Sequence, residues 1–423
     1  MDHATYNAYI NILEEELIPA MGCTEPIAVA YAAAIANNRL GCMPEKVIIK
    51  VSPNILKNVK SVVVPNTGGL RGVEAAAAAG IVAGDWTKQL EVISEVSDEQ
   101  RLLIAAYLDE CEFVLMKSES GFVFDIEIIV MSGEHTAVCR IAGSHTNVIY
   151  IAKDNEKGLE IPFAEERVGS GTDRSVLSIE GICEFADSVR IEDVKTVLDR
   201  QIEYNMAISK AGMDGQYGAC IGKVLMASYG DTVQNRAKAF AAAGSDARMN
   251  GCNMPVIINS GSGNQGITAS VPVIVYAKDM GCSDDFLYRA LVVSNLVTIH
   301  LKTGIGPLSA YCGAISAGCG AGAGVTYLRG GKFREIAHTI VNAVAINSGV
   351  ICDGAKSSCA AKIASAVEAG LLGMQMFEYG TQFYGGEGIV TKGVENTIRN
   401  VGRLARQGMA GTDKEIIDIM ISC

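Results

Sequence analysis

The chain has 423 residues, of which 49% are apolar and 19% charged, and its formal net charge is −12. This length and composition predict two or three folding units with much buried surface, some of it between subunits, so we expect a homo-oligomer. The acidic balance disfavours nucleic acid as a partner, because a phosphate backbone is bound by clustered Lys and Arg. Apolar runs are interrupted before the roughly 20 residues of a membrane span, and the N-terminus lacks a secretory pattern. We therefore expect a cytoplasmic protein without membrane contact.

Two helices are predicted at the N-terminus. Apolar residues recur every three or four positions over residues 4–18, which indicates one face of a helix that Pro19 ends. The alanine-rich stretch 27–37 predicts a second helix. Cys23, in the run Met-Gly-Cys-Thr-Glu-Pro, lies in the turn between them. We expect residues 1–40 to pack on a helical domain further along the chain.

Residues 41–190 show a mixed pattern that predicts an α+β domain. Runs of β-branched residues indicate strands, and they are interspersed with two helical stretches, at 73–83 and 98–109. The predicted strands are 46–51, 61–64, 122–131, 135–141 and 147–152.

From residue 191 to 423 the pattern is almost entirely helical. Its helix faces are rich in Ala, Gly, Ile and Val, which favours close helix packing. The fold class is therefore α+β, with a mixed α/β N-terminal segment and a large all-helical C-terminal domain. The predicted helices are 191–211, 216–228, 232–243, 284–301, 308–328, 333–347, 355–371 and 388–406.

Among the thirteen cysteines, three lie beside glycine or in small-residue segments: Cys23, Cys312 and Cys352. No pair of them has the two-residue spacing of a zinc knuckle. If they meet in the fold, three thiolates would hold an iron-sulfur cluster and leave its fourth corner open for chemistry. Cys319 and Cys359 have similar surroundings, and spacing alone does not choose among the five.

A glycine-rich segment at residues 260–266 carries Ser262, Asn264 and Gln265 between two apolar runs. Glycines expose backbone N–H groups, and the amides both donate and accept hydrogen bonds. The segment is interpreted either as a cradle for a substrate carboxylate or as a tight turn. A phosphate loop is less favoured because the Gly-Lys-Ser/Thr ending is missing.

Three further side chains are candidates, each with an ordinary structural alternative. His145 contacts substrate or is a structural histidine, and Arg71 pairs with a carboxylate or is a solvated surface residue. Lys302 is a general base if burial lowers its pKa, and otherwise an exposed lysine at a helix end.

The Cys23 motif, the 260–266 segment and the Cys312 and Cys352 segments, taken together, resemble the L-cysteine desulfidase family, which is related to the α chain of iron-sulfur L-serine dehydratases. The resemblance implies a 4Fe-4S cluster held by Cys23, Cys312 and Cys352, with residues 191–423 as the cluster-binding catalytic domain. Thr24 and Glu25, which follow Cys23 in its motif, become candidates for substrate binding.

The resemblance also implies the reaction, an α,β-elimination that converts the small amino acid L-cysteine to pyruvate, ammonia and sulfide without pyridoxal phosphate. In some related serine dehydratases a C-terminal cysteine ligates the open iron, and we hypothesise the same for Cys423. L-serine dehydration by the same cluster is the enzymatic alternative. A thiol-rich sensor or storage protein is the non-enzymatic alternative, and a zinc enzyme with three thiolate ligands is a further one.

Overall fold

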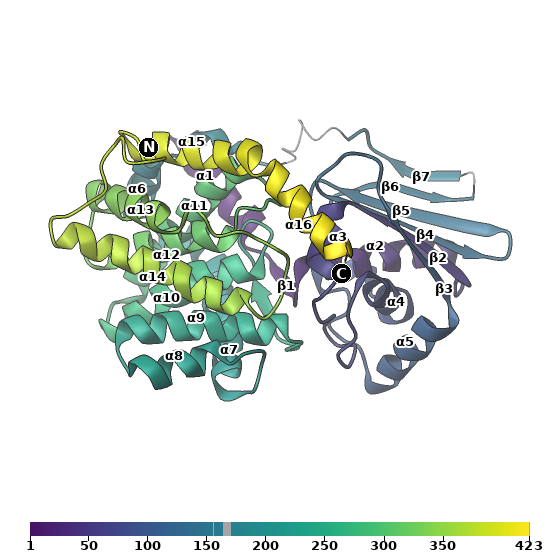
Figure 1. Cartoon of the computed structure of the whole chain (residues 1–423). Helices are drawn as coiled ribbons and strands as arrows, with labels where there is room; N and C mark the ends of the chain where they lie inside the picture. The colour runs from purple at the N-terminus through teal and green to yellow at the C-terminus, as the bar shows by residue number, and fades with distance from the viewer. Residues whose placement is uncertain (155, 164–170, 423) are drawn as a thin grey trace.

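The computed structural model describes residues 1–154, 156–163 and 171–422. It has two regions side by side, one built of helices and one of a sheet covered by helices, and α16 extends from the first to the second (Figure 1). The α+β fold class is thus confirmed. None of the helices within these ranges is long and apolar enough to cross a bilayer.

The sheet has six strands in the order β3-β2-β4-β5-β6-β7. Only the β2–β3 pair is parallel, and the other neighbours are antiparallel. Along β2, the buried residues Val47, Ile49 and Val51 alternate with more exposed positions. One face of the sheet is therefore covered and the other is more open to solvent. The strands are β2 (Lys46–Val51), β3 (Glu112–Lys117), β4 (Asp125–Ser132), β5 (His135–Ala142), β6 (Val148–Lys153) and β7 (Glu156–Glu160).

The covered face is packed by α2, and α4 lies against α2 as the next layer. The α2–α4 contact is close because Gly80 of α4 has no side chain: a Cβ there would lie 2.1 Å from the carbonyl oxygen of Ala30. The helices of this region are α2 (Thr24–Leu40), α3 (Pro53–Val59), α4 (Val73–Ala83) and α5 (Asp98–Glu110), with the 3-10 turn Trp86–Glu91.

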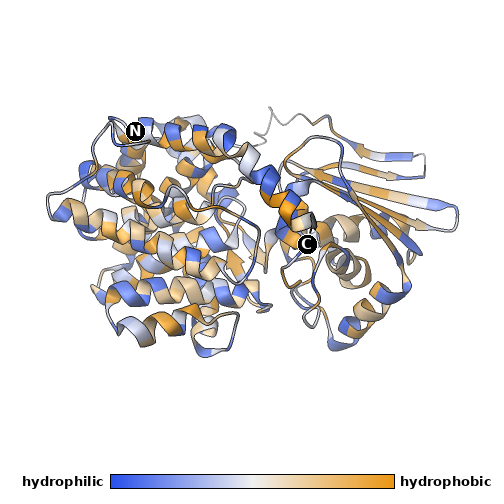
Figure 2. Cartoon of the chain, in the orientation of Figure 1, coloured by the Kyte–Doolittle hydropathy of each residue, from blue (hydrophilic) through white to orange (hydrophobic). Residues whose placement is uncertain are grey.

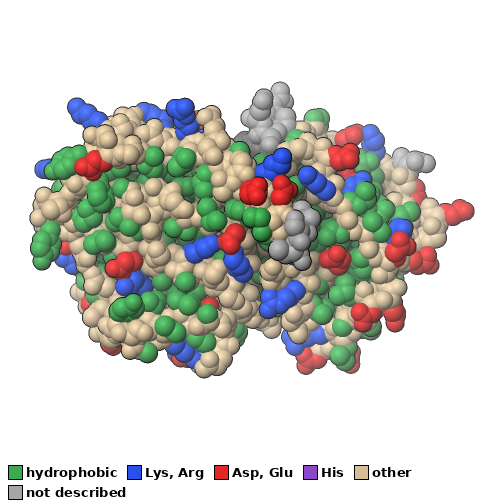
Figure 3. All heavy atoms as spheres, viewed as in Figure 1, with side chains coloured by type: hydrophobic (Ala, Val, Ile, Leu, Met, Phe, Trp, Pro, Cys, Tyr) green, Lys and Arg blue, Asp and Glu red, His purple; other side chains and the backbone are tan. Residues whose placement is uncertain are grey.

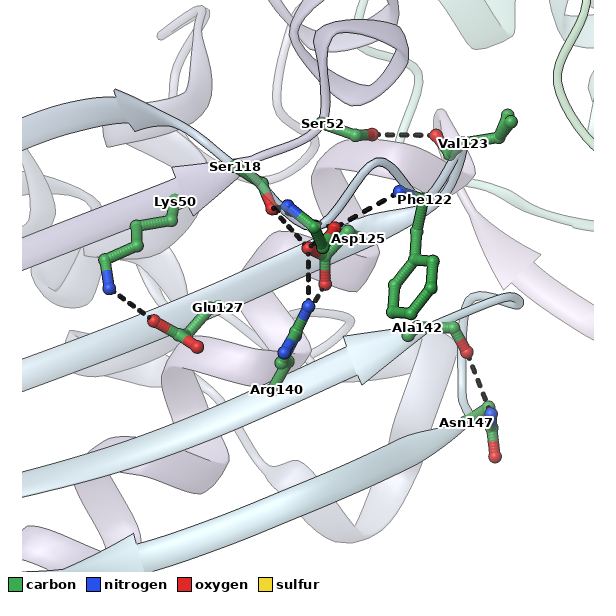
Figure 4. A network of polar contacts seen from close by, with 11 residues as sticks. Lys50, Ser52, Ser118, Phe122, Val123, Asp125, Glu127, Arg140, Ala142 and Asn147 are labelled. Carbon is green, nitrogen blue, oxygen red and sulfur yellow. Dashed lines mark hydrogen bonds and ion pairs between the residues drawn. The ribbon is translucent and has the colours of Figure 1, made fainter. Parts of the chain in front are cut away.

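A buried ion pair closes the end of the sheet that faces the helical region (Figure 4). Asp125 is 1% exposed and accepts from Arg140 at both oxygens, with Nε at 2.8 Å and Nη2 at 2.9 Å. Ser118 and Ser120 also donate to this carboxylate. Just beyond it, Asn147 Nδ2 donates to the Ala142 carbonyl at 2.8 Å and holds the loop that contains His145.

The helical region is centred on α10 and α12, whose residues are nearly all buried among the surrounding helices. Alanine and glycine predominate in α12, so neighbouring backbones approach closely. The first helices of the region are α1 (His3–Glu16), α6 (Ile179–Ser188), α7 (Ile191–Asp214), α8 (Ile221–Tyr229), α9 (Val233–Met249) and α10 (Gly263–Asp279). The others are α11 (Asp284–Ile305), α12 (Gly313–Leu328), α13 (Phe333–Asn347), α14 (Cys359–Glu378), α15 (Val394–Arg403) and α16 (Ala410–Ser422).

The N-terminal segment, expected to pack as a whole on the helical domain, is divided between the regions. α1 contacts α7 and α11, whereas α2 packs on the sheet and α4. The reason is that α2 is buried on nearly every side, which suits a helix between a sheet and a second helix better than one on a bundle surface. A short antiparallel pair, β1 (Pro19–Met21) with β8 (Pro255–Ile257), links the N-terminal segment to the chain before α10.

Two other expectations are corrected, and two helices were not predicted. Residues 61–64 form no strand, only an isolated bridge between Val63 and Arg71. The apolar stretch after residue 266 is α10, a helix that the pattern did not predict, and the segment 410–422 is the further helix α16. Residues 179–188, assigned to the α+β domain, form α6 and pack on α11 and α13.

The surface follows the composition. On the face shown in Figure 3, Lys and Arg side chains are scattered among Asp and Glu, and apolar side chains lie over the helical region. α16 alternates hydrophilic and hydrophobic residues along its length (Figure 2). It lies against α3, where the buried Lys57 Nζ contacts Asp413 Oδ1 at 2.5 Å.

Candidate functional site

Cys23 lies at the start of α2, where the two regions meet. It is the N-cap of that helix and is 2% exposed. The preceding Gly22 has φ +50°, and a Cβ there would lie 2.0 Å from Cγ of Pro65, so only glycine fits this turn without a shift. The β1–β8 pair then holds the Cys23 turn next to the chain that leads into α10.

Thr24 connects this turn directly to the glycine-rich segment. Its Oγ1 donates to the Gly261 carbonyl at 2.9 Å. Glu25, 9% exposed, accepts from Cys23 Sγ at 3.0 Å and from Thr24 Oγ1 at 3.2 Å. Thr24 therefore contacts the turn before α10, and Glu25 lies beside Thr24 and Cys23.

The glycine-rich segment is a short turn followed by a helix, not a continuous loop. Ser262 is the N-cap of α10, and Asn264 and Gln265 lie in its first turn. The Ser262 side chain makes no capping hydrogen bond. The first N–H groups of α10 therefore lack a side-chain acceptor at a helix end that favours anions.

Cys312 and Cys352, forty residues apart, are held together by their backbones. Tyr311 and Ile351 form an antiparallel bridge. The Cys312 N–H donates to the Val350 carbonyl at 3.1 Å, and the Cys352 N–H donates to the Ala310 carbonyl at 2.6 Å. Cys312 is also the N-cap of α12, again without a side-chain cap.

The beginnings of α10 and α12 are in contact. A Cβ on Gly313, the first residue of α12, would lie 2.7 Å from Cδ of Gln265. Because Thr24 joins the start of α2 to the same place, the N-termini of α2, α10 and α12 converge. Their partial positive charges favour thiolates and bound anions in the space they share.

A fourth thiol lies near these three. Cys23 packs in a small cluster with Val62 and Met249, and Cys359 borders it. Cys359 Sγ is 3.7 Å from the Gly354 carbonyl, in the segment that follows Cys352. Cys319, the other cysteine that spacing did not exclude, lies in the middle of α12.

Burial raises the pKa of two of these thiols, Cys23 and Cys312, and so favours their protonated form. Burial raises the pKa of Cys312 to about 12, and the neighbouring Cys352 adds to the rise. Burial also raises the pKa of Cys23, followed by the charge of Glu25, while Arg248 opposes the rise. Among the described residues no three His, Cys, Asp or Glu side chains are arranged around a single metal ion. Binding of a metal centre would therefore require proton release and some closure of the thiols.

Several buried polar atoms around the start of α10 have no hydrogen-bond partner. One of these atoms belongs to Arg248, at the end of α9, a residue that the sequence patterns did not indicate as functional. Its position in the last turn of a helix is typical of a cation that only complements the helix dipole. The unpartnered atoms are Asn264 Oδ1, Gln265 Oε1, His145 Nε2 and Arg248 Nε.

His145 reaches the site from the sheet region. Its ring lies 4.8 Å from that of Phe124, edge to face. A Cβ on Gly261 would be 3.0 Å from its Cε1, so the imidazole packs on the turn before α10. Burial lowers its pKa, which the Glu25 charge opposes and the Arg248 charge assists, so the ring is neutral.

Lys302, near the end of α11, is 6% exposed. Its ammonium donates to the carbonyls of Gly306 and Pro307. Burial lowers its pKa to about 8, and the nearby Cys352 and Cys312 act in the opposite direction. It is therefore a buried amine near two of the three thiols, not an exposed lysine.

Arg71 and Cys423 are the remaining candidates. Arg71 is exposed, and its Nη1 donates to the Ser61 carbonyl at 2.6 Å. Cys423 lies outside the described residues.

Comparison with known proteins places the chain in a family. A model of the serine dehydratase α chain matches residues 87–418, and the chain belongs to that family. Family membership indicates a serine dehydratase-like lyase. The match excludes Cys23, which lies before it.

Full-length relatives cover the Cys23 segment as well. A UPF0597 protein of Desulfitobacterium hafniense is 59% identical over 99% of this chain and 97% of its own. One from Lachnoclostridium phytofermentans is 47% identical over 99% of this chain and all of its own, and one from Treponema denticola is 44% identical over 100% and 99%. Their names state no substrate.

Proposed function

We propose that this chain is an iron-sulfur-dependent lyase that eliminates sulfide from L-cysteine, yielding pyruvate and ammonia. The observation that carries the proposal is that Cys23 and Cys312 are the N-caps of α2 and α12, whose N-termini converge, while backbone hydrogen bonds hold Cys352 beside Cys312. Membership in the serine dehydratase α-chain family supports elimination as the reaction class.

The residues fit a 4Fe-4S cluster by their chemistry. Three cysteines provide soft ligands for three corners, and the helix N-termini stabilise the negative charge of cluster and thiolates. Cys23, Cys312 and Cys352 would hold it. When bound, the cluster supplies a Lewis-acidic iron that neutralises charge on the leaving group.

The substrate is held by side chains that converge on the start of α10. We propose that Ser262, Asn264 and Gln265 bind the amino acid, since two of their buried oxygens lack partners. Thr24 orients this turn, and Glu25 accepts hydrogen bonds from the substrate ammonium.

Lys302 is the proposed general base. With its pKa near 8 it is partly neutral at physiological pH, and Nζ can then take the proton from Cα as the Cβ–S bond breaks. The product of that step is aminoacrylate, which tautomerises and hydrolyses to pyruvate and ammonia. His145, which is neutral and packs on the turn before α10, is the second proposed catalytic group.

L-serine is the alternative substrate. Exchange of sulfur for oxygen leaves the carboxylate and ammonium contacts unchanged, and the family is named for serine dehydration. Turnover of both amino acids, compared side by side under anaerobic conditions, distinguishes them: the proposal requires the larger kcat/KM for L-cysteine.

The ligand assignment is tested by anaerobic reconstitution with iron and sulfide, followed by absorption spectroscopy, iron content and a sulfide-release assay. Cys312→Ala should lose both the cluster spectrum and activity by more than about 100-fold, an effect larger than loss of an outer-shell partner. Cys42→Ser, at an exposed thiol, is the matched control. A Cys312→Ala enzyme that kept both would refute the assignment.

For Cys423 we propose ligation of the open iron in the resting enzyme. Cys423→Ser should shorten the lifetime of the cluster in air when substrate is absent, and saturating substrate should abolish the difference. Equal cluster lifetimes in wild type and variant would contradict this role.

A further inference from the structure

Arg248 is a buried cation that makes no ion pair with any residue that the structure describes. It is 2% exposed and ranks among the largest fully buried side chains of the described chain. Its Nε has no hydrogen-bond partner there. A charged group away from water is costly unless it is paired, so a protein that keeps one in this state gains from it elsewhere.

The guanidinium lies against the first turn of α10. A Cβ on Gly263 would be 2.4 Å from Arg248 Nε and 2.9 Å from Cζ, so the absence of a side chain at residue 263 makes room for it. The following N–H groups of α10 have no side-chain cap from Ser262. An unpaired cation and a helix N-terminus thus face the same place, and both favour an anion.

The groups around this place are those of the proposed active site. Met249, the next residue, packs against Cys23. Gly261 contacts His145 on one side of the turn, and Gly313 contacts Gln265 on the other. An anion bound by Arg248 would therefore lie close to Cys23 and His145, two of the groups assigned to the proposed active site.

We propose that Arg248 binds the α-carboxylate of the substrate and restricts the enzyme to α-amino acids. This inference rests on the proposed lyase function. A guanidinium presents parallel N–H donors that match the two oxygens of a carboxylate, which an amide alone cannot do with equal strength. Arg248 fixes the carboxyl end, Glu25 the ammonium, and the side chain of the amino acid is left to face the thiols.

The experiment compares two probes that differ only in the carboxylate, L-2-aminobutyrate and propylamine. Binding to anaerobically reconstituted enzyme is measured by calorimetry for wild type, Arg248→Met, Arg248→Lys and the control Arg329→Gln. Arg329 is exposed and paired with Glu378 at the surface. Because neither probe has a leaving group, the measurement is independent of turnover.

In wild type, L-2-aminobutyrate should bind at least about 100-fold more tightly than propylamine, as expected for a buried charge pair. Arg248→Met should remove that difference, and Arg248→Lys should restore part of it as a point charge. Iron and sulfide contents should equal those of wild type, and the unfolding midpoint of the apo form should be unchanged or higher, since an unpaired buried charge has been removed. Arg329→Gln should bind both probes as wild type does.

Unchanged preference for L-2-aminobutyrate in Arg248→Met would overturn the inference. So would loss of iron in that variant, which would assign the cation to the cluster, or a midpoint several degrees lower in the apo form, which would assign it to folding. If wild type shows the Arg248-dependent preference but turns over neither L-cysteine nor L-serine, the proposed function fails and the carboxylate site stands.

Discussion

The sheet region and the junction treat buried charge in opposite ways. In the sheet, Asp125 is paired by Arg140 at both oxygens and by two serines (Figure 4). At the junction, the equally buried Arg248 has no partner at Nε, and neighbouring amide and imidazole atoms also have none. Since a fold normally satisfies its buried polar groups, this difference supports the proposal that the junction binds a ligand.

Several helix ends away from the site are capped by a side chain, although those of α4, α7 and α15 are not. α11 begins with Ser283, whose hydroxyl accepts from the Phe286 N–H, and α9 begins with Thr232 bonded in the same way to Asn235. The helices that meet at the site begin with Cys23, Ser262 and Cys312, and none of these side chains makes a cap. Stability is given up at these three ends, and the exposed N–H dipoles become available to anions.

The largest effect is expected at Lys302. Lys302→Gln should lower kcat by about 100- to 10,000-fold, the range for loss of a general base. In wild type, kcat/KM should rise with pH through about 8, because the amine must be neutral to accept a proton. A pH profile of the reconstituted enzyme measures this, and a wild-type profile flat between pH 7 and 9 would argue against Lys302.

The lowered pKa of Lys302 also predicts how the free energy of unfolding depends on pH. Its pKa is about 8 in the folded chain against 10.5 for the free side chain, so the folded state binds fewer protons between these values. The free energy of unfolding of the apo protein should therefore rise as pH increases from about 8 to 10.5. Chemical denaturation across this range should show the slope in wild type and a smaller one in Lys302→Met.

A structural effect is expected in the sheet. Asp125→Ala should lower the free energy of unfolding by about 3 kcal/mol, because it leaves Arg140 without its buried partner. Glu127→Gln, at the neighbouring and more exposed pair with Lys50, is the control and should cost under about 1 kcal/mol. Equal losses in the two variants would remove the distinction between paired networks and surface pairs.

The smallest effect is expected at Arg71. Its side chain is exposed and donates to a backbone carbonyl, so Arg71→Gln should change the free energy of unfolding by no more than about 0.5 kcal/mol. We also expect KM to change less than twofold, in contrast to Arg248→Met. A KM for Arg71→Gln as high as that of Arg248→Met would show that a surface arginine, not the buried one, binds substrate.

Sequence patterns predicted most elements, including amphipathic helices such as α7 and α13. They missed α10. α10 is buried all round and contains Pro272, so its Ile and Val residues carry no helical period. Val62, Val63 and Val64 are β-branched, yet no neighbouring strand pairs with them, and they bend into a turn next to Pro65.

The site divides in the same way. The sequence by itself determined the chemistry available: three cysteines in small-residue segments, a lysine before one of them, and a resemblance that joined them into one proposed centre. Only the tertiary structure decided which arginine is buried without a partner among the described residues. Arg71 and Arg248 are the same residue type in the sequence, but Arg71 is exposed to water and Arg248 is buried. Burial and pairing depend on residues far apart in the chain, and these set the charge, the pKa and the ligand preference of each group.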